Sequence, residues 1–118
     1  MTYIDTFIAA VPTVNKEKYR QHAEDAAAVF KKFGAVQLIE CWGDDVPHGE
    51  VTDFYKAVKA NEDETIVLSC IFWPDKATRD AGTPKAFGEM KTAGADLAEM
   101  PFDGSRVILG GFETILEV

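Results

Sequence analysis

The sequence lacks the segments that carry proteins into or across membranes. Its 118 residues contain no apolar run that approaches the roughly 20 residues a membrane-spanning helix requires. The opening residues, Met1 to Asp5, also lack the basic stretch and long apolar run of a secretory signal. We therefore expect a cytoplasmic protein, without a membrane as a partner.

Cysteine is scarce, since Cys41 and Cys70 are the only two in the chain. A chain of this size has material for its own apolar core and needs no disulfide framework. Both cysteines stand in apolar, strand-like stretches, which predicts that they are small buried hydrophobic side chains. A redox pair is the alternative that the sequence leaves open.

Positive charge is scarce as well. Lysine and arginine number 12 against 20 acidic residues, which gives a net charge of −8 at pH 7. The basic residues are scattered and do not alternate with aromatic residues, as they do in proteins that grip single-stranded nucleic acids. Such a chain repels phosphate backbones, so nucleic acid is not an expected partner. Acidity of this kind favours solubility.

Familiar motifs for cofactors and nucleophiles are absent. The sequence contains no phosphate-binding glycine loop, nucleophile elbow or paired-cysteine metal motif. Gly110 and Gly111 stand inside a predicted strand, where they favour a bulge or a close backbone contact over ligand binding. No cofactor is therefore expected.

What the sequence does contain is a regular succession of strand-like and helix-like stretches. Strands are predicted over residues 3–11, 35–42, 65–73 and 106–116. The first helix follows Pro12, with Thr13 or Asn15 as its cap and Gly34 as its stop. Its apolar face consists of side chains at helical spacing, namely Tyr19, Ala23, Ala26, Phe30 and Phe33.

Two later segments carry conflicting signals. Residues 51–60 fit both a helical turn and one face of a strand, and we favour a hairpin arm. The second helical region follows Pro74, with Asp75 as its N-cap. Four helix-breaking residues interrupt this region, which predicts two short helices instead of one. They are Gly82, Pro84, Gly88 and Gly94.

The order of these elements is strand, helix, strand, strand, helix, strand. This is the split βαβ, or ferredoxin-like βαββαβ, arrangement, an α+β fold with a four-stranded antiparallel sheet. Right-handed crossovers place both helical regions on the same face of that sheet. We expect residues 1–118 to form a single domain.

The predicted strands are too apolar for a sheet that has one face in water, where apolar and polar residues should alternate. Residues 66–73 are apolar on both faces apart from Ser69. The helices can cover one face only, so the other would expose more apolar area than is usual on monomers. We therefore predict a homodimer that buries the second face between two copies.

Several stretches resemble a known family. They are residues 3–12, residues 40–47, residues 100–106 and the Gly110-Gly111-Phe112 that follows. Together they resemble the YbaA-like family of small bacterial proteins of unknown function, which is placed in the dimeric α/β-barrel superfamily. The resemblance runs nearly end to end and implies a ferredoxin-like fold that pairs into a dimeric α/β barrel. It brings no established activity, and the superfamily's functions are too varied for the fold to indicate one.

His22 is the candidate catalytic residue. It lies three residues after Tyr19 and four before Ala26, on the apolar face of the first predicted helix. An imidazole that points between this helix and the sheet would serve as a general base. The alternative is a core histidine that binds a backbone carbonyl.

Aromatic side chains at strand ends are candidates for a ligand pocket. Trp42 and Trp73 end two strands that should be neighbours, and their indole N–H groups would supply polar contacts in an apolar pocket. Phe7, Phe72 and Phe112 would complete its wall. The alternative is that these rings belong to the core or to the dimer interface.

Charged residues provide two further candidates. Arg106 would hold a substrate carboxylate or pair with an acid across the dimer, and we favour the structural pairing. A turn-forming segment also carries several possible metal ligands, whose types suit a hard metal or zinc. These are Glu40, Asp44, Asp45, His48 and Asp53. Their spacing matches no standard motif, so we favour a solvated turn and expect no metal.

These candidates lead to three hypotheses, and whether the protein is an enzyme stays open. The favoured one is a homodimeric module that binds a small apolar or aromatic molecule. The second is a cofactor-independent monooxygenase-like enzyme that uses His22 and the tryptophans on an oxidisable aromatic substrate. The third is a metal-dependent enzyme at the acidic turn.

Overall fold

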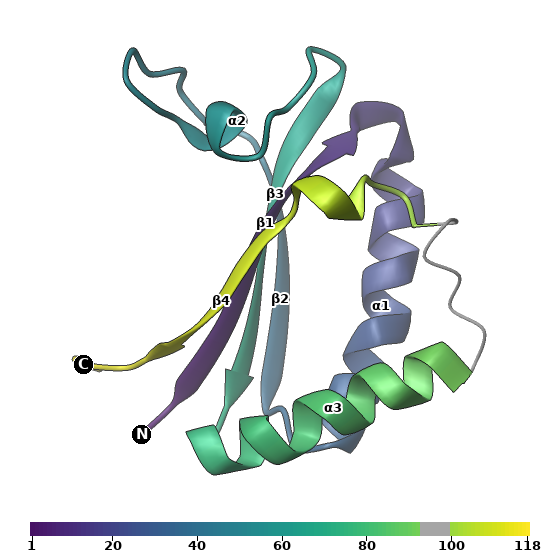
Figure 1. Ribbon diagram of the computed structural model, residues 1–118, viewed down its shortest axis with the longest axis vertical. Coiled ribbons are helices and arrows are strands. Elements are labelled where there is room, and N and C mark those ends of the chain that lie inside the picture. Colours follow the sequence, from purple (N-terminus) through teal and green to yellow (C-terminus); the bar gives the residue numbers. More distant parts are fainter. Residues whose placement is uncertain (93–99) are drawn as a thin grey trace.

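The computed structural model describes residues 1–92 and 100–118 and contains a four-stranded antiparallel sheet. In chain order its elements are β1 (Tyr3–Pro12), the 3-10 helix η1 (Thr13–Asn15), α1 (Lys16–Lys32), β2 (Gln37–Trp42), α2 (Phe54–Ala57), β3 (Glu64–Trp73), α3 (Lys76–Thr92), the 3-10 helix η3 (Gly104–Arg106) and β4 (Ile108–Glu113). The strands lie in the order β2-β3-β1-β4, and α1 and α3 pack on the same face (Figure 1). The predicted ferredoxin-like α+β fold is therefore confirmed.

The register between strands decides which side chains face the helices. β1 and β3 pair along their whole length, from Tyr3 opposite Trp73 to Pro12 opposite Glu64. Because side chains alternate along a strand, the odd-numbered residues of β1 and β3 face α1 and α3. The other side is termed the open face. It consists of Ile4, Thr6, Ile8, Ala10 and Pro12 of β1, Gln37, Ile39 and Cys41 of β2, Glu64, Ile66, Leu68, Cys70 and Phe72 of β3, and Ile108, Gly110 and Phe112 of β4.

The core lies between the sheet and helices α1 and α3. Two groups of buried side chains fill it, one of them around the fully buried Trp73 and the other around the fully buried Val67. The first group contains Tyr3, Phe30, Ala35, Ile71, Trp73 and Ala86, and the second contains Ala9, Val11, Tyr19, Ala23 and Val67. Each large apolar side chain that is fully buried contributes roughly 1.5–3 kcal/mol to folding.

Helix α1 forms where the sequence predicts it. Tyr19, Ala23 and Phe30 are its buried residues, and they point toward the sheet. Gly34 follows the helix with a φ of 114°, a conformation that favours glycine because a side chain would be strained there. Lys31 and Lys32 lie in the last turn, at the negative end of the helix dipole.

Of the predicted helix caps, Asp75 is confirmed and the alternatives Thr13 and Asn15 are wrong. Neither Thr13 nor Asn15 caps α1 with its side chain, because η1 intervenes at this point. Thr13 instead forms a hydrogen bond with Thr65 of β3, with 2.7 Å between the two Oγ1 atoms. Asp75 does cap the second helical region, since its Oδ1 accepts a hydrogen bond from the backbone N–H of Thr78 at 2.7 Å.

Helix α3 is continuous through Pro84, so the expected two short helices are wrong over residues 76–92. Gly82 and Ala86 are buried against the sheet. A Cβ at residue 82 would lie only 2.8 Å from the Trp73 ring, so this glycine allows the helix to approach the sheet closely. Packing on that side offsets the backbone hydrogen bond that a proline removes. Gly94 lies outside the described residues.

Residues 51–60 contain the short helix α2, so the predicted hairpin arm is wrong. Asp53 Oδ1 accepts a hydrogen bond from the backbone N–H of Lys56 at 2.6 Å and thereby starts the helix. Val58, which is 1% exposed, packs against Ala10 and anchors the segment on the sheet. The cap by Asp53 and the burial of Val58 therefore determine the conformation of residues 51–60, where the spacing of apolar residues is ambiguous.

The open face carries large apolar side chains that the single chain leaves in contact with water. Ile39 and Leu68 are each 38% exposed, Ile108 is 43% exposed and Phe112 is 57% exposed. Helix α2 covers only one end of this face, while α1 and α3 lie on the other side (Figure 1). Among the strand residues of the open face only Glu64, at the end of β3, is charged, and Arg106 forms an ion pair with it.

Both cysteines lie on the open face, which corrects the expectation that they are buried. Cys41 is exposed and Cys70 is half-buried, and both thiols are free. The physical reason is that the sheet has a second apolar face, which the sequence pattern does not distinguish from the first. Cys70 Sγ lies 3.6 Å from Thr6 Oγ1, which is within hydrogen-bonding distance for a sulfur atom.

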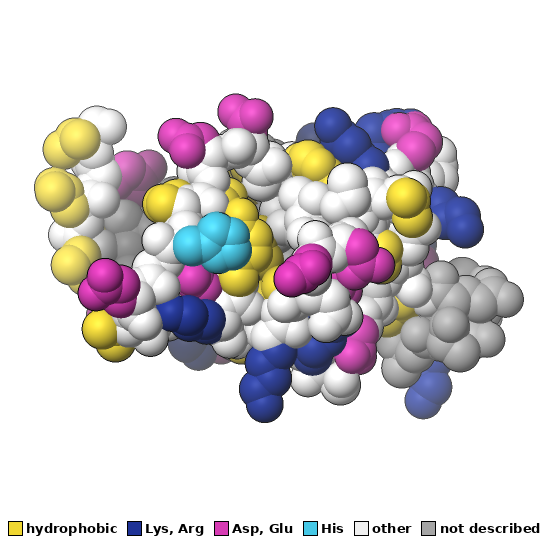
Figure 2. Space-filling model, turned by 90° about the horizontal axis from the view of Figure 1, so that it is seen from above, with side chains coloured by type: hydrophobic (Ala, Val, Ile, Leu, Met, Phe, Trp, Pro, Cys, Tyr) yellow, Lys and Arg dark blue, Asp and Glu magenta, His cyan; other side chains and the backbone are white. Residues whose placement is uncertain are grey.

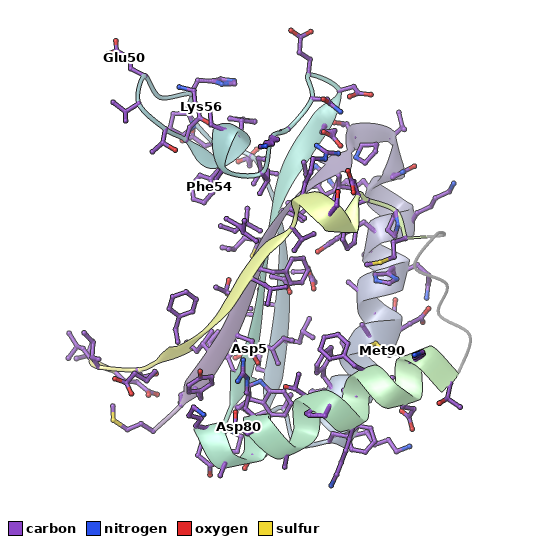
Figure 3. All side chains as sticks on the ribbon, viewed as in Figure 1. Asp5, Glu50, Phe54, Lys56, Asp80 and Met90 are labelled. Carbon is purple, nitrogen blue, oxygen red and sulfur yellow. The ribbon has the colours of Figure 1, made fainter. Side chains whose placement is uncertain are left out.

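An ion pair ties the start of α3 to the first strand. Asp5 lies between the sheet and α3 (Figure 3), where Arg79 donates to both of its carboxylate oxygens, the shortest contact being 2.7 Å. The indole N–H of Trp73 donates to the same carboxylate at 3.0 Å. A side chain at Gly111 would overlap the Tyr3 hydroxyl beside this pair, which agrees with the close backbone contact expected there.

No helix in the described parts of the chain is long and apolar enough to span a membrane.

Replacement of Arg79 by Met is expected to lower the free energy of unfolding by about 2 kcal/mol, because the Asp5 carboxylate would keep only one partner. The Asp5 side chain is 18% exposed, so water compensates little. Urea denaturation of the purified variant measures the loss. The matched control is Lys76→Met, which breaks an exposed pair with Asp80 and should leave stability nearly unchanged. Equal effects of the two substitutions would contradict this account.

Candidate functional site

The helix side of the sheet holds a half-buried carboxyl group, that of Glu40. β2 presents Glu40 toward α1, and two hydroxyl groups donate hydrogen bonds to it. Tyr19 Oη lies 2.5 Å from Glu40 Oε2, and Ser69 Oγ lies 2.8 Å from Glu40 Oε1. These three residues are termed the Glu40 cluster.

Strand register and helix spacing together produce this cluster. Glu40 and Ser69 stand directly opposite each other across β2 and β3. Tyr19 belongs to the buried face of α1 and is 4% exposed. Ser69, which is 1% exposed, is the one polar residue in the apolar stretch 66–73, and its hydrogen bond to Glu40 accounts for a hydroxyl at that position.

The electrostatics of the cluster are governed by burial. Burial raises the pKa of Glu40 above its ordinary value, and the hydrogen bonds from Tyr19 and Ser69 and the charge of His22 only partly oppose this shift. Burial and the adjacent Glu40 carboxylate also raise the pKa of Tyr19, so its hydroxyl remains a donor. Among the described residues, no lysine, arginine or histidine forms a salt bridge with Glu40.

Aromatic rings surround the cluster. The Phe102 ring lies 5.8 Å from Tyr19, 6.5 Å from Phe7 and 6.1 Å from His22, measured between ring centroids. The His22 ring meets Phe102 edge-on, and the Trp42 ring lies 6.4 Å from Tyr19. These separations are typical of favourable aromatic contacts. The site therefore combines an acid, two hydroxyls and an imidazole within an apolar wall.

The structure brings together only part of the pocket predicted from the sequence. Phe7, Trp42 and His22 lie around the Glu40 cluster. Trp73 lies at the opposite end of the sheet, where it is fully buried and bonds Asp5. Trp42 and Trp73 are far apart because β2 and β3 run in opposite directions, so their last residues lie at opposite ends of the strand pair.

The remaining aromatic candidates face away from the cluster. Phe72 and Phe112 belong to the open face, on the other side of the sheet from Glu40. They do not line a pocket with Phe7. Their position fits the alternative reading from the sequence, in which strand-end aromatic rings serve an interface.

Arg106 is occupied by contacts within its own chain. Its Nη1 and Nη2 donate to the two carboxylate oxygens of Glu64 at 2.8 and 2.7 Å, and its Nε donates to Asp103 at 3.0 Å. Nη1 also donates to the carbonyl of Lys59 at 2.8 Å. The favoured structural pairing therefore forms inside one chain, and the guanidinium does not line the Glu40 cluster.

The acidic turn does not assemble into a metal site. Glu40 faces the core, whereas Asp53 accepts hydrogen bonds from backbone N–H groups at the start of α2. His48 stacks on Tyr55, with 4.2 Å between the ring centroids. Within residues 1–92 and 100–118, no three histidine, cysteine, aspartate or glutamate side chains are grouped closely enough to hold a metal ion.

Sequence reasoning missed three members of the site. The sequence pattern places Glu40 in the acidic turn, shows Ser69 only as an exception in an apolar stretch, and includes Phe102 only in the stretch 100–106 that carries the family resemblance. One signal was available for the first two, because a lone polar residue in an apolar strand requires a hydrogen-bond partner. The cross-strand register that pairs Ser69 with Glu40 is absent from the sequence pattern.

A second concave feature lies on the open face beside α2. Residues 43–63, termed the α2 arm, project from the end of the sheet, and Phe54 of this arm points toward the strands (Figure 3). Under the arm is an apolar hollow of about 140 Å³, termed the α2 hollow. It is lined by Cys41, Trp42, Gly43, Val46, Phe54, Ile66 and Leu68.

Comparisons with known proteins agree with the sequence resemblance. The family described as "Protein of unknown function (DUF1428)" matches residues 2–104. The chain is 50% identical over 119 residues to "Uncharacterized protein YbaA" of Escherichia coli strain K12, with 99% of both chains covered. YbaA of Shigella flexneri is similar to the same degree, 50% over 119 residues. These matches confirm the resemblance to the YbaA-like family.

Solved structures share the fold, and one of them illustrates the likeness. It is described as a dimeric ferredoxin-like protein from an uncultured marine organism, and it matches with a TM-score of 0.62 at 11% sequence identity. The match covers 99% of this chain and 98% of that chain. At this identity the likeness establishes the fold alone.

Replacement of Glu40 by Gln is expected to improve stability relative to the unaltered protein as the pH rises from about 4 to about 7. A carboxyl whose pKa is raised by folding contributes stability that is fully present below its unfolded pKa. This contribution is lost as the pH rises through the folded pKa, which for Glu40 lies above 4.5. Gln does not titrate, so the variant avoids that loss. Urea denaturation across the pH range measures the difference.

Glu64→Gln is the matched control and has the opposite sign. Arg106 lowers the pKa of Glu64 below 4.5, so the stability that Glu64 contributes is present above this value and is lost as the pH falls through the folded pKa. The penalty of this substitution should therefore be largest near neutral pH and shrink in acid. Parallel pH profiles for the two variants would refute the assignment of Glu40.

Proposed function

This chain belongs to the DUF1428 family of proteins of unknown function, and on that premise we propose that it acts as a homodimer that binds a small aromatic molecule at the Glu40 cluster. The dimer would form through the open face, and the molecule would bind on the helix side of the sheet. We place the protein in the cytoplasm as part of the same proposal.

The uncovered open face supports the homodimer. Its exposed isoleucine, leucine and phenylalanine side chains are the residues that stable interfaces bury, and standard interfaces bury roughly 800 Å² per partner. A second copy carries the same net charge of −8, yet the one charged strand residue of the open face, Glu64, lies at its end and is already paired with Arg106. Two copies can therefore approach without burying like charges. The solved relative in fold is itself described as dimeric, which adds support.

The observation that carries the ligand proposal is a contrast among three acids on the sheet. Asp5 and Glu64 each have an arginine partner, at 2.7 Å in both cases. Within the described residues, the hydrogen-bond partners of the Glu40 carboxyl are two hydroxyl groups, and its pKa is raised by burial. Titratable groups whose pKa is shifted by burial cluster at functional sites.

The chemistry of the site favours a phenol-like ligand. A carboxylate accepts hydrogen bonds, and Tyr19 and Ser69 already supply two donors while lone pairs remain for a third. The rings of Phe102 and Trp42 suit a flat apolar body. A small aromatic molecule with one hydroxyl group would satisfy both features, as binding sites with an apolar wall and few polar contacts do.

His22 supports a second candidate function, oxidation of such a phenol by oxygen. Its ring contacts Phe102 beside the cluster. In that role a neutral His22 imidazole would accept the phenolic proton, and the electron-rich phenolate would pass its electrons to oxygen. With hydroquinone this transfers two electrons and two protons in total, which gives benzoquinone and hydrogen peroxide. The experiment on ligand binding described below distinguishes this enzyme from a binding module.

Leu68→Asp is expected to weaken the homodimer by about 100-fold or more, because a buried, unpaired charge at an interface costs on the order of 2–5 kcal/mol. Light scattering over a range of protein concentrations measures the dissociation. Maleimide labelling of Cys41, another open-face residue, should be slow in the unaltered dimer and faster in the variant. Val14→Asp is the control, since Val14 is 93% exposed on η1, outside the open face. A monomeric unaltered protein at tens of micromolar would overturn the proposal.

4-Ethylphenol is expected to bind with saturation, whereas ethylbenzene, which lacks the hydroxyl group, should bind at least tenfold more weakly. Glu40→Gln should reduce phenol affinity by about 10-fold, since hydrogen bonds to charged groups contribute roughly 1.5–3 kcal/mol. Calorimetry or ligand-observed NMR measures both effects. Glu24→Gln, on the exposed side of α1, is the matched control.

Measurement of oxygen consumption with hydroquinone, in an oxygen electrode, separates the two functions. Binding without oxygen uptake supports the binding module. Uptake that disappears in His22→Phe supports the oxidation. Phenol affinity that is unchanged in Glu40→Gln, or absent altogether, would remove the Glu40 cluster as the site.

A further inference from the structure

The segment after β4 exposes apolar side chains in the single chain. Ile115 is 89% exposed and Leu116 is 75% exposed, and Val118 is fully exposed. Thr114 fixes the start of this segment, because its hydroxyl donates to the carbonyl of Thr2. Figure 2 shows a group of hydrophobic side chains at the same edge of the molecule as the C-terminus in Figure 1. Residues 114–118 are termed the tail.

The tail and the α2 arm project from the same side of the sheet but at opposite ends of it (Figure 1). The open face lies between these two projections, while α1 and α3 occupy the other side. Two copies that meet through their open faces therefore have to accommodate both projections. How they do so depends on the direction of the two-fold axis.

Only one of the two simple directions makes the projections complementary. If the axis runs along the strands, arm meets arm and tail meets tail, which keeps the central strands apart. If the axis runs across the strands, the tail of each copy lies at the end of the sheet from which the arm of the other projects. The tail follows the edge strand β4 and the hollow lies over β2 and β3, so the tail has to cross the partner's sheet to reach the hollow. A two-fold interface repeats every contact, so each copy would both give a tail and receive one.

The α2 hollow has the size and chemistry to receive a tail side chain. Its volume is about 140 Å³, and an apolar cavity of roughly 150 Å³ holds a benzene-sized group. Its lining is apolar, and it includes Leu68 and Cys41 of the open face. One isoleucine or leucine side chain is of the right size and leaves no charge buried.

We propose that residues 114–118 of each copy insert an aliphatic side chain, from Ile115 or Leu116, into the α2 hollow of the other copy. This inference rests on the proposed homodimer and specifies how its two copies engage. The second copy thereby covers the hollow that the single chain leaves open. It also removes the exposed apolar tail from water.

Disulfide trapping tests this contact directly, because Cys41 already lines the hollow. Leu116→Cys and Ile115→Cys are prepared separately in a Cys70→Ser background and exposed to a mild oxidant. A disulfide forms only when the two Cα atoms come within roughly 4.4–6.8 Å. We expect one of the two variants to give a covalent dimer on a non-reducing gel. Cys41→Ser in that variant should abolish the dimer band, and Val14→Cys should give no band dependent on Cys41.

Removal of residues 114–118 provides the second measurement. Loss of two buried aliphatic side chains per dimer should raise the dissociation constant by about 100-fold. Maleimide should also label Cys41 faster in the shortened chain at a concentration where it is still dimeric.

The outcomes separate this inference from the homodimer itself. A dimer that forms no Cys41-dependent link with either tail cysteine, and whose Cys41 reacts equally fast without the tail, overturns the inference and leaves the homodimer standing. A full-length chain that is monomeric in light scattering overturns both. A covalent link within one chain, seen as a monomer band with altered mobility, also overturns the inference.

Discussion

The structure depends on one constraint, which is that both faces of the sheet are apolar while α1 and α3 cover only one of them. On the helix side, buried side chains such as Val67 and Trp73 supply the stability of the single chain. On the open face, Leu68 and Ile108 remain partly in water. The same strands therefore serve folding with one set of alternating residues and association with the other. This division explains why an acidic chain keeps its charges off the centre of the open face.

Three partly or fully buried acids of the strands, Asp5, Glu40 and Glu64, differ in their partners. Asp5 and Glu64 are held by arginines, and each pair fastens one element to another, α3 to β1 in the first case and η3 to β3 in the second. Glu40 forms no such ion pair with any of the described residues. Its hydroxyl partners satisfy hydrogen bonds without neutralising a charge, so the carboxyl retains both its proton affinity and its capacity to accept a further donor. That difference singles out the Glu40 cluster among the polar groups of the core.

The fold could be predicted from the sequence because the spacing of apolar residues and the order of the elements along the chain determine it, as the four strands and α1 illustrate. It failed where a contact between distant residues overrode a local preference. Pro84 stays within one helix because its neighbours pack on Trp73, and residues 51–60 become helical because Asp53 caps them. The site was predicted only in part for the same reason. His22 was found from helical spacing, whereas the partnership of Glu40 with Ser69 exists only once β2 and β3 are in register.

The contacts of Arg106 have a consequence for the kinetics of association. By binding Glu64 and the carbonyl of Lys59 together, Arg106 fixes the root of the α2 arm to the strands before any partner arrives. An arm fixed in this way acts as a preformed wall, so encounter between molecules resembles rigid docking. Its rate would then be limited by mutual orientation, in the range of roughly 10⁵–10⁷ M⁻¹s⁻¹ typical of preorganised proteins, instead of by a slow rearrangement of the arm.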